Sequence, residues 1–363
     1  MKILMLGESL ERQGGIVSVE KLILQEALSN TSIKLIPTLP KGSAIKKLLV
    51  FSSAVVQLVG SLLANKADVI HIHISEGGSA YRHMITALIT LIFQKPVIMH
   101  AHSCNFHEFY PKLPSLIQVW MSWIFSKSTR FIVLSESWKK FYVDNLKLKV
   151  EQVTVLPNPV RLPSQVPERQ NSSTVSFVFL GRIGQRKGAF DLISAFAKLS
   201  EKHKQRASLT LAGDGEGEKA RDLVKSLELT SSINILDWVN QTQRDELLNQ
   251  ANVFVLPSYN EGLPMALIEA MSWSLPVITT PVGGIPELVI NYDNGLLVNP
   301  GDIQQLSDAI ESLIKDEQLR LMLGQRARAS VAHLDIVNYM NSLTKIYSLA
   351  FTGSPAINLG VKA

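Results

Sequence analysis

Short runs of apolar residues alternate with longer stretches of helical period along the chain. In the first half, strand-like runs occur at residues 2–7, 68–74, 96–102, 130–135 and 153–158. After residue 174 they return at 175–181, 208–213, 233–239, 253–257, 276–280 and 295–300. Strands that alternate with helices are typical of βαβ units and parallel sheets. The pattern therefore predicts an α/β fold with two doubly wound sheets.

One stretch interrupts this alternation. Residues 157–174, PNPVRLPSQVPERQNSST, are rich in proline, serine and polar residues and lack an apolar period, which indicates a linker. A length of 363 residues also exceeds what one core usually supports. We expect a Rossmann-like domain at 1–165 and a second at 172–334. An amphipathic helix near 335–350 opens a C-terminal segment, 335–363, that we expect to pack back on the first domain, with a loosely held tail.

Composition narrows the choice of partners. The net charge of +5 is mild for this length and does not indicate nucleic acid, but it suits phosphorylated ligands or the anionic inner face of a membrane. The single cysteine, Cys104, excludes an internal disulfide and a multi-cysteine zinc site. We expect a cytoplasmic protein.

Residues 48–64, LLVFSSAVVQLVGSLLA, have about the minimum length for a membrane span. Polar residues within the run favour a buried or surface-seated helix over a span. Lys46 and Lys47 precede the run, and a basic-flanked apolar helix can seat on an anionic bilayer. Residues 44–66 therefore predict either a membrane-seated helix or a core helix of the first domain.

The segment GRIGQRKG, residues 181–188, follows a predicted strand and holds Arg182 and Lys187 around a glycine-rich turn. The arginine fork and the lysine charge are suited to a phosphate group, and the alternative is a solvated basic loop. The chain has no Walker loop, and GDGEG at 213–217 lacks the dinucleotide-binding spacing.

A second candidate is NEGLPMALIEAM, residues 260–271. Pro264 suits the first helical position, so we expect a helix to begin there and to offer unpaired amides at about 263–265 to an anion such as a diphosphate. Glu261 is expected in the loop at the mouth of the site, with Glu269 inside the helix. The two carboxylates are suited to sugar hydroxyls; the alternative is a dipole partner plus a satisfied core glutamate.

Together these motifs closely resemble the retaining glycosyltransferases of the GT-B fold, family 4. The likeness covers roughly residues 175–300 and includes Gly213-Asp214-Gly215, E-G-L-P-x-x-x-x-E and PVGGIPELV. The first half is similar more weakly, through Gly14-Gly15 and His102. The resemblance implies two Rossmann-like domains that face one another across a cleft.

The resemblance also implies roles for individual residues. Arg182 and Lys187 would bind the donor diphosphate, Glu269 the nucleotide ribose, and Glu261 the transferred sugar. Gly15 would let its loop approach the diphosphate, and His102 would lie near the anomeric carbon. The phosphate site would be completed by the backbone at Gly262, Leu263, Pro264 and Met265. Transfer would retain configuration without a cofactor, and the lack of a D-x-D motif agrees with a site that needs no metal.

The segment HIHISEGGSAYRH, residues 71–83, is similar to segments of bacterial polysaccharide-assembly glycosyltransferases. This implies that Arg82 and Glu76 lie near the acceptor or a phosphate. His71 and His73 are interpreted as facing opposite sides of a strand, so no metal site is expected from this pair.

The sequence thus predicts transfer of a sugar from a UDP- or GDP-sugar to a glycan or lipid-linked acceptor in cell-surface polysaccharide or glycolipid synthesis. The expected location is the cytoplasm, at the inner face of the plasma membrane. Two alternatives stay open. One is a sugar-nucleotide epimerase or hydrolase on the same fold, and the other is a non-catalytic sugar-nucleotide-binding protein.

Overall fold

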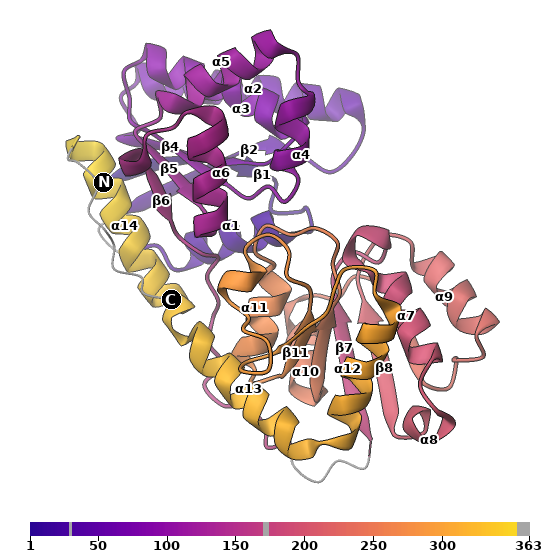
Figure 1. Cartoon of the computed structure of the whole chain (residues 1–363). Helices are drawn as coiled ribbons and strands as arrows, with labels where there is room; N and C mark the ends of the chain where they lie inside the picture. The colour runs from indigo at the N-terminus through magenta and orange to yellow at the C-terminus, as the bar shows by residue number, and fades with distance from the viewer. Residues whose placement is uncertain (29–30, 170–173, 354–363) are drawn as a thin grey trace. The chain divides into compact units, whose positions relative to one another are not determined.

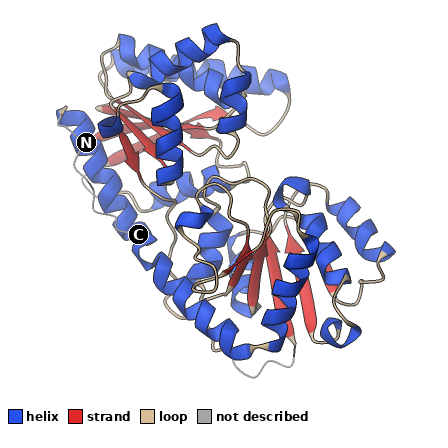
Figure 2. Ribbon diagram, viewed as in Figure 1, coloured by secondary structure: helices blue, strands red, loops and turns tan. Residues whose placement is uncertain are grey.

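The computed structural model describes residues 1–28, 31–169 and 174–353, which form two α/β units (Figures 1 and 2). Unit 1 comprises residues 1–159 together with the segment from Leu334, and unit 2 comprises residues 160–333. Each unit holds one six-stranded sheet, and all of the paired strands run parallel. The predicted α/β class is confirmed. Part of the expected linker, 170–173, and the tail from residue 354 lie outside the described residues.

The sheet of unit 1 has the strand order β2-β1-β3-β4-β5-β6. Its strands are β1 (Lys2–Glu8), β2 (Ser32–Leu39), β3 (Val69–Ile74), β4 (Val97–Ala101), β5 (Arg130–Val133) and β6 (Val153–Val155). Its helices are α1 (Gly15–Gln25), α2 (Ala44–Leu63), α3 (Gly78–Ile92), α4 (Phe106–Phe109), α5 (Ser115–Ser126), α6 (Glu136–Leu146) and α14 (Ile336–Thr352).

Strand β2 is missing from the strands expected from the sequence. Lys34 and Pro37 interrupt its apolar run, so the segment lacks the continuous pattern of a buried strand. The strand order places β2 at the edge of the sheet, where it pairs with β1 alone. Proline and charged residues are tolerated at an edge because one side of the strand needs no partner.

Helix α14 packs on β3 and β4, within unit 1. Its buried stripe consists of Ile336, Tyr339, Met340, Leu343, Ile346, Tyr347 and Ala350. Burying each large side chain of this kind contributes about 2 kcal/mol. The stripe therefore holds the helix against the sheet although unit 2, residues 160–333, lies between β6 and α14 in the sequence.

The sheet of unit 2 has the order β12-β11-β10-β7-β8-β9. Its strands are β7 (Val175–Leu180), β8 (Ala207–Ala212), β9 (Ile233–Leu236), β10 (Val253–Leu256), β11 (Val277–Thr279) and β12 (Leu296–Leu297). Its helices are α7 (Ala189–Ala197), α8 (Glu201–Lys204), α9 (Gly217–Ser226), α10 (Gln241–Gln250), α11 (Met265–Ser272), α12 (Ile303–Lys315) and α13 (Glu317–Val331). The run predicted at 295–300 contains only the two-residue strand β12.

Because the strands are parallel, their carboxyl ends meet at one edge of each sheet, where ligands bind in open α/β folds. The loops after β7, β8 and β10 share this edge in unit 2, because β7 lies between β10 and β8 in the sheet. The same rule brings together the ends of β1, β3 and β4 in unit 1.

Candidate functional site

The loops at the carboxyl edge of unit 2 approach so closely that glycine is required where they meet. A Cβ on Gly213 would lie 1.8 Å from the carbonyl oxygen of Gly181. Gly188 has a φ of +67°, and a Cβ there would lie 2.1 Å from the Pro257 carbonyl oxygen. Left-handed backbone and contacts of this kind exclude a side chain. The two glycines thus fix the loop that carries Arg182 and Lys187 against the loops after β8 and β10.

Lys187 and Glu261 form an ion pair in which the side chains are 14% and 6% exposed. The hydroxyl of Ser258 donates a hydrogen bond to the same Glu261 oxygen, at 2.7 Å. Glu261 lies in the loop before α11, as expected, and it is buried between these two partners. A lysine ammonium has three donors, so Lys187 can hold Glu261 and a ligand anion together.

Arg182 contributes a second positive charge. Its guanidinium donates to Asp214 at 3.0 Å, and its side chain is 66% exposed. A guanidinium has five N–H donors, and one is used here. Asp214 therefore steadies the arginine and leaves most of its donors for a ligand.

Helix α11 begins at Met265, with Pro264 as its N-cap, so the expected start is one residue early. The amides of Leu267 and Ile268 both donate to the Pro264 carbonyl. Those of Met265 and Ala266 have no acceptor in the described part of the chain. An unpaired helix N-terminus of this kind attracts anions.

The loop before α11 is held from behind by the 281–287 segment. The Gly284 amide donates to the Gly262 carbonyl at 2.7 Å. Gly283 has a φ of +57°, and a Cβ there would lie 1.9 Å from the Glu261 carbonyl oxygen. The PVGG motif therefore supports the backbone at Glu261 and Gly262, directly before α11.

Glu269 is buried on α11 and forms an ion pair with Arg244, a residue that the sequence did not indicate. Its carboxylate lies 2.7 Å from the guanidinium of Arg244, on α10. Burial raises the pKa of Glu269 to about 7, and the Arg244 charge opposes this rise. A buried glutamate in an apolar helix signals that a cation is needed. Only the fold identifies which cation, because 25 residues separate the two positions.

In unit 1, Gly14 and Gly15 begin α1 at the carboxyl end of β1. Gly14 has a φ of +141°, and no heavy atom lies within 4 Å of where its Cβ would be. Gly15 is the first helical residue and is absent from the positive-φ positions. The glycine that the backbone requires is therefore Gly14, while close approach at Gly15 stays a prediction.

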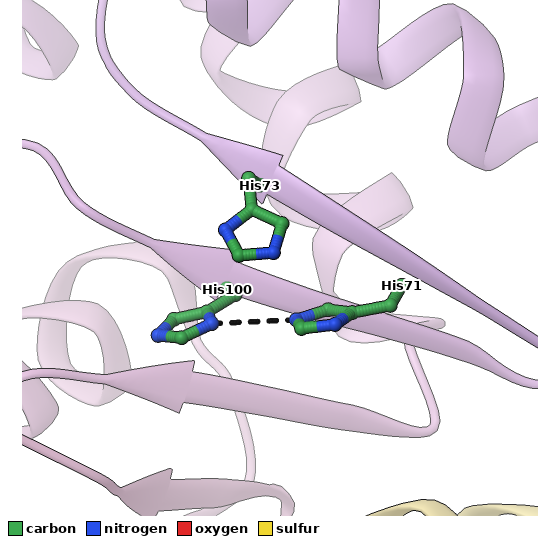
Figure 3. A group of neighbouring side chains, drawn as sticks. All are labelled: His71, His73 and His100. Atoms are coloured by element: carbon green, nitrogen blue, oxygen red, sulfur yellow. Dashed lines mark hydrogen bonds between the residues drawn. The ribbon is translucent and has the colours of Figure 1, made fainter. Parts of the chain in front are cut away.

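His102 follows β4 and is partly buried. Its Nε2 lies 2.9 Å from Nδ1 of His73. The expectation that His71 and His73 face opposite sides of β3 is wrong, because residues two apart on a strand share a face. Their ring centroids are 4.4 Å apart, and one nitrogen from each of His71, His73 and His100 lies within 4.8 Å of the others (Figure 3).

Charged residues surround Arg82 at the same edge of unit 1. Nε of Arg82 is buried without a hydrogen-bond partner among the described residues. Burial lowers the pKa of Arg82, while the charge of Glu8 raises it and that of Arg12 lowers it. Glu8 and Arg12 form an ion pair at 2.6 Å. The Ser103 hydroxyl donates to Glu76 at 2.5 Å. Glu76 therefore contacts the residue that directly follows His102.

Glu20 on α1 is a buried carboxyl that the sequence did not single out. It is fully buried, Oε1 accepts from the Glu8 amide at 3.1 Å, and Oε2 has no partner within the described residues. Burial raises its pKa to about 8. Unfolding returns the group to its ordinary range near 4.5, so the folded state holds its proton more tightly.

The contribution of Glu20 to stability is therefore complete below pH 4.5 and is lost as the pH rises through about 8. We expect the free energy of unfolding of wild type to fall between pH 6 and pH 9 by more than that of Glu20→Gln. Urea unfolding at both values measures this. Glu11→Gln, at an exposed position, is the matched control and should follow wild type. Parallel pH profiles for wild type and Glu20→Gln would contradict the prediction.

Comparison with known proteins identifies the family. The sequence profile for glycosyl transferases group 1 matches residues 164–330, and that for glycosyltransferase family 4 matches residues 21–162. The chain therefore belongs to the GT-B glycosyltransferases of family 4, as the resemblance in its sequence implied, and it is a transferase enzyme.

Two curated relatives show the range of the family. The chain is 26% identical over 328 residues to an Escherichia coli UDP-Gal:alpha-D-GlcNAc-diphosphoundecaprenol alpha-1,3-galactosyltransferase, covering 86% of this chain and 82% of that protein. It is 31% identical over 217 residues to the capsular polysaccharide biosynthesis glycosyltransferase CapM of Staphylococcus aureus, covering 56% and 57%.

Solved structures share the fold. HepE of Anabaena, crystallised with UDP, has a TM-score of 0.77 at 18% identity and covers 96% of this chain and 100% of that one. Sucrose-phosphate synthase from Thermosynechococcus elongatus has a TM-score of 0.78 at 19% identity and covers 97% and 100%.

Proposed function

We propose that this chain is a retaining, metal-independent glycosyltransferase that moves a sugar from a UDP- or GDP-sugar to a lipid-linked or glycan acceptor. Its product would enter cell-surface polysaccharide or glycolipid synthesis, at the cytoplasmic face of the plasma membrane. The observation that carries the proposal is the group at the carboxyl edge of unit 2. There the Lys187–Glu261 pair, Arg182, and the unpaired amides at the start of α11 offer donors to a diphosphate.

The roles of the donor-site residues are those that the family resemblance implies, and the chemistry of each group supports them. Lys187 and Arg182 offset the negative charge that develops on the departing nucleotide diphosphate, so no metal ion is assigned to this step. The Glu269 carboxylate accepts hydrogen bonds from the ribose hydroxyls, and Glu261 accepts from the transferred sugar. The backbone at Gly262, Leu263, Pro264 and Met265 forms the wall of the phosphate site.

In the proposed reaction, the acceptor oxygen bonds to the anomeric carbon on the face from which the diphosphate leaves. The bond between that carbon and the diphosphate oxygen breaks, and the acceptor proton passes to the departing phosphate. His102 contacts the sugar near the anomeric carbon, and Gly15 lets the backbone approach the diphosphate.

Unit 1 would supply the acceptor side. Arg82 has an unused buried donor and is suited to a phosphate, and Glu76 is suited to a sugar hydroxyl. A lipid-linked diphosphate sugar would present both groups. The name of the Escherichia coli relative, which specifies a diphosphoundecaprenol acceptor for that protein, supports this choice.

A two-stage experiment tests the function. Purified protein is screened with nucleotide sugars for thermal stabilisation, and each hit is then offered lipid extracts as acceptor. We expect a UDP- or GDP-sugar to raise the melting temperature and to label an extractable lipid with retained anomeric configuration. Release of free sugar or an epimer without any acceptor would contradict transfer as the main activity.

Membrane contact is the second part of the proposal. By length and composition, helix α2 is long and apolar enough to cross a membrane. It packs on β2, but only 17% of its most apolar 18-residue stretch is buried. Its Ala54, Leu58 and Leu62 join the hydrophobic core of unit 1, while most of its other side chains are exposed or half-buried. Helix α3 contacts both α2 and α5 (Figure 1). Large apolar side chains are exposed on all three: Ile45, Leu48, Leu49, Val56, Leu63, Ile85, Ile92, Leu116, Val119, Trp120 and Trp123.

The charge around this apolar surface is suited to an anionic bilayer. Lys46 and Lys47 lie in the first turn of α2, and Lys66, Lys95 and Lys127 follow the ends of α2, α3 and α5. Apolar side chains that enter the acyl boundary, flanked by lysines at the headgroups, are typical of interfacial binding. Trp120 and Trp123 are suited to the interface, since tryptophan concentrates there.

Replacing Trp120 and Trp123 with serine is expected to weaken binding to phosphatidylglycerol vesicles by about ten-fold or more. Vesicle cosedimentation measures this, and neutral phosphatidylcholine vesicles should bind less in both proteins. Trp238→Ser removes an exposed tryptophan of unit 2 and is the matched control, with unchanged binding. Equal binding by wild type and the double variant would contradict the assigned surface.

A further inference from the structure

Four histidines share one face of the unit 1 sheet, at the carboxyl ends of β3 and β4. His71 and His73 lie on β3, His100 pairs with His73 across the strands, and His102 follows β4. Ring centroids of neighbouring members are 4.1–5.4 Å apart. Figure 3 shows three of the rings turned toward one another. The proposed reaction uses His102 alone, so the other three call for a physical explanation.

Two separate hydrogen-bonded chains connect these rings. In the first, His73 Nδ1 and His102 Nε2 are 2.9 Å apart. In the second, His100 Nδ1 lies 3.3 Å from His71 Nε2, and His71 Nδ1 lies 2.9 Å from the hydroxyl of Tyr347 on α14. Nε2 of His73 and Nε2 of His100 are buried and lack partners among the described residues.

The positions of the protons follow from these unpaired atoms. Burial lowers the pKa of all four histidines, to about 3 for His71 and His102, so every ring is neutral and has one proton. A buried N–H without an acceptor is rarer and costlier than a buried lone pair without a donor. The protons of His73 and His100 therefore reside on Nδ1, where a partner is available.

We propose that His73 is a positioning residue that donates from Nδ1 to His102 Nε2 and so locks His102 as the tautomer with its proton on Nδ1. This inference rests on the proposed contact of His102 with the sugar. Nδ1 of His102 has no partner within the described residues and is not among the buried unpaired atoms, so it is open to a ligand. His102 then presents its Nδ1–H as a donor to the ligand, and the hydrogen bond from His73 selects this tautomer.

This assignment has a consequence for the reaction. Because Nε2 of His102 is occupied by His73 and Nδ1 holds the proton, neither nitrogen of the neutral ring is free to take the acceptor proton. His102 acts as a hydrogen-bond donor to a sugar oxygen, and the departing phosphate remains the base. The other tautomer would turn a lone pair toward that oxygen, so it could only accept a hydrogen bond there and could not donate one.

Metal binding is the competing explanation of the cluster. One nitrogen from each of His71, His73 and His100 lies within 4.8 Å of the others, so the three rings could in principle converge on a metal ion. However, His71 Nε2 and His100 Nδ1 share a hydrogen bond at 3.3 Å, which a bound metal ion would displace. The proposed role of His73 in fixing the His102 tautomer requires only the hydrogen bonds that the structure contains.

The first test does not depend on activity. Two-bond proton–nitrogen NMR of protein labelled with ¹⁵N-histidine distinguishes the tautomers, with His102→Asn used to assign the His102 signals. We expect His102 to have a protonated Nδ1 and a bare Nε2 in wild type. His102 with a protonated Nε2 would overturn the proposal, as would about one equivalent of tightly bound zinc by elemental analysis.

The second test links the lock to transfer. His73→Leu is expected to lower kcat by at least about ten-fold, with a smaller change in donor KM, and to mix the His102 tautomers. In His73→Asn the amide takes the position of Nδ1, so it should restore much of kcat. Tyr347→Phe alters only the hydrogen bonds of His71 and His100 and should leave the His102 tautomer unchanged.

The outcome for His73→Leu is judged together with His102→Ala. Wild-type kcat in a folded His73→Leu variant would overturn the positioning role if His102→Ala is inactive. If His102→Ala is active, the role proposed for His102 fails instead, and the NMR result still decides the tautomer.

Discussion

Replacing Lys187 with alanine is expected to lower sugar transfer by at least about 100-fold while the chain remains folded. The ammonium lies beside Glu261 at the carboxyl edge of unit 2, where the diphosphate charge would develop. Its removal takes away a positive charge that acts more strongly on the departing group than on the bound donor. Steady-state rates with the donor found by thermal screening measure the loss.

Stability separates this effect from simple damage. Lys187→Ala leaves the buried Glu261 carboxylate without its charge partner, which costs about 3 kcal/mol of unfolding free energy. The double variant with Glu261→Gln removes the uncompensated charge, so we expect it to regain stability but not transfer. Lys198→Ala, at an exposed lysine of unit 2, is the matched control and should behave as wild type. Normal transfer by Lys187→Ala would refute the assigned donor site.

Replacing Glu269 with glutamine is expected to weaken donor binding by about 10- to 100-fold. A carboxylate accepts from both ribose hydroxyls, whereas an amide offers one acceptor oxygen. Because the pKa of Glu269 is raised to about 7, the free protein holds a proton there below neutral pH. Donor binding must release that proton, so affinity should rise with pH through about 7 in wild type and lose this dependence in Glu269→Gln.

Isothermal titration calorimetry at pH 6 and pH 8 measures both effects. Arg244→Gln tests the ion pair between Arg244 and Glu269, because loss of the arginine charge would raise the pKa of Glu269 further. We expect the rise in affinity to shift to higher pH in that variant. Glu246→Gln, on the same helix as Arg244, is the control. An unchanged affinity and pH profile in Glu269→Gln would rule out a ribose contact.

The sequence predicted the parallel sheets well because buried parallel strands are apolar on both faces and appear as continuous runs. Strand β2 was missed because it lies at the edge of the sheet and lacks a continuous apolar run. As an edge strand it includes Lys34 and Pro37, which no central strand would tolerate. The pattern thus identifies strands by their burial, and it fails where an element is only half enclosed.

The candidate site divides in a similar way. The spacing from Glu261 to Glu269 placed one carboxyl before a helix and one within it, because helix start signals are local. The partners of both carboxyls are distant in sequence: Lys187 for Glu261 and Arg244 for Glu269. No local rule relates residues on different strands and helices. Their charges and burial therefore became readable only from the structure.

By itself, the sequence determined the fold class, the family and the residue types available to hold a diphosphate and two sugars. Only the tertiary structure decided which of these groups touch, that Glu261 is buried, and that His73 reaches His102. The physical reason is that hydrophobic periodicity and turn chemistry act over a few residues. Ion pairs, desolvation and imidazole tautomers instead depend on neighbours that the parallel sheets bring together from distant parts of the chain.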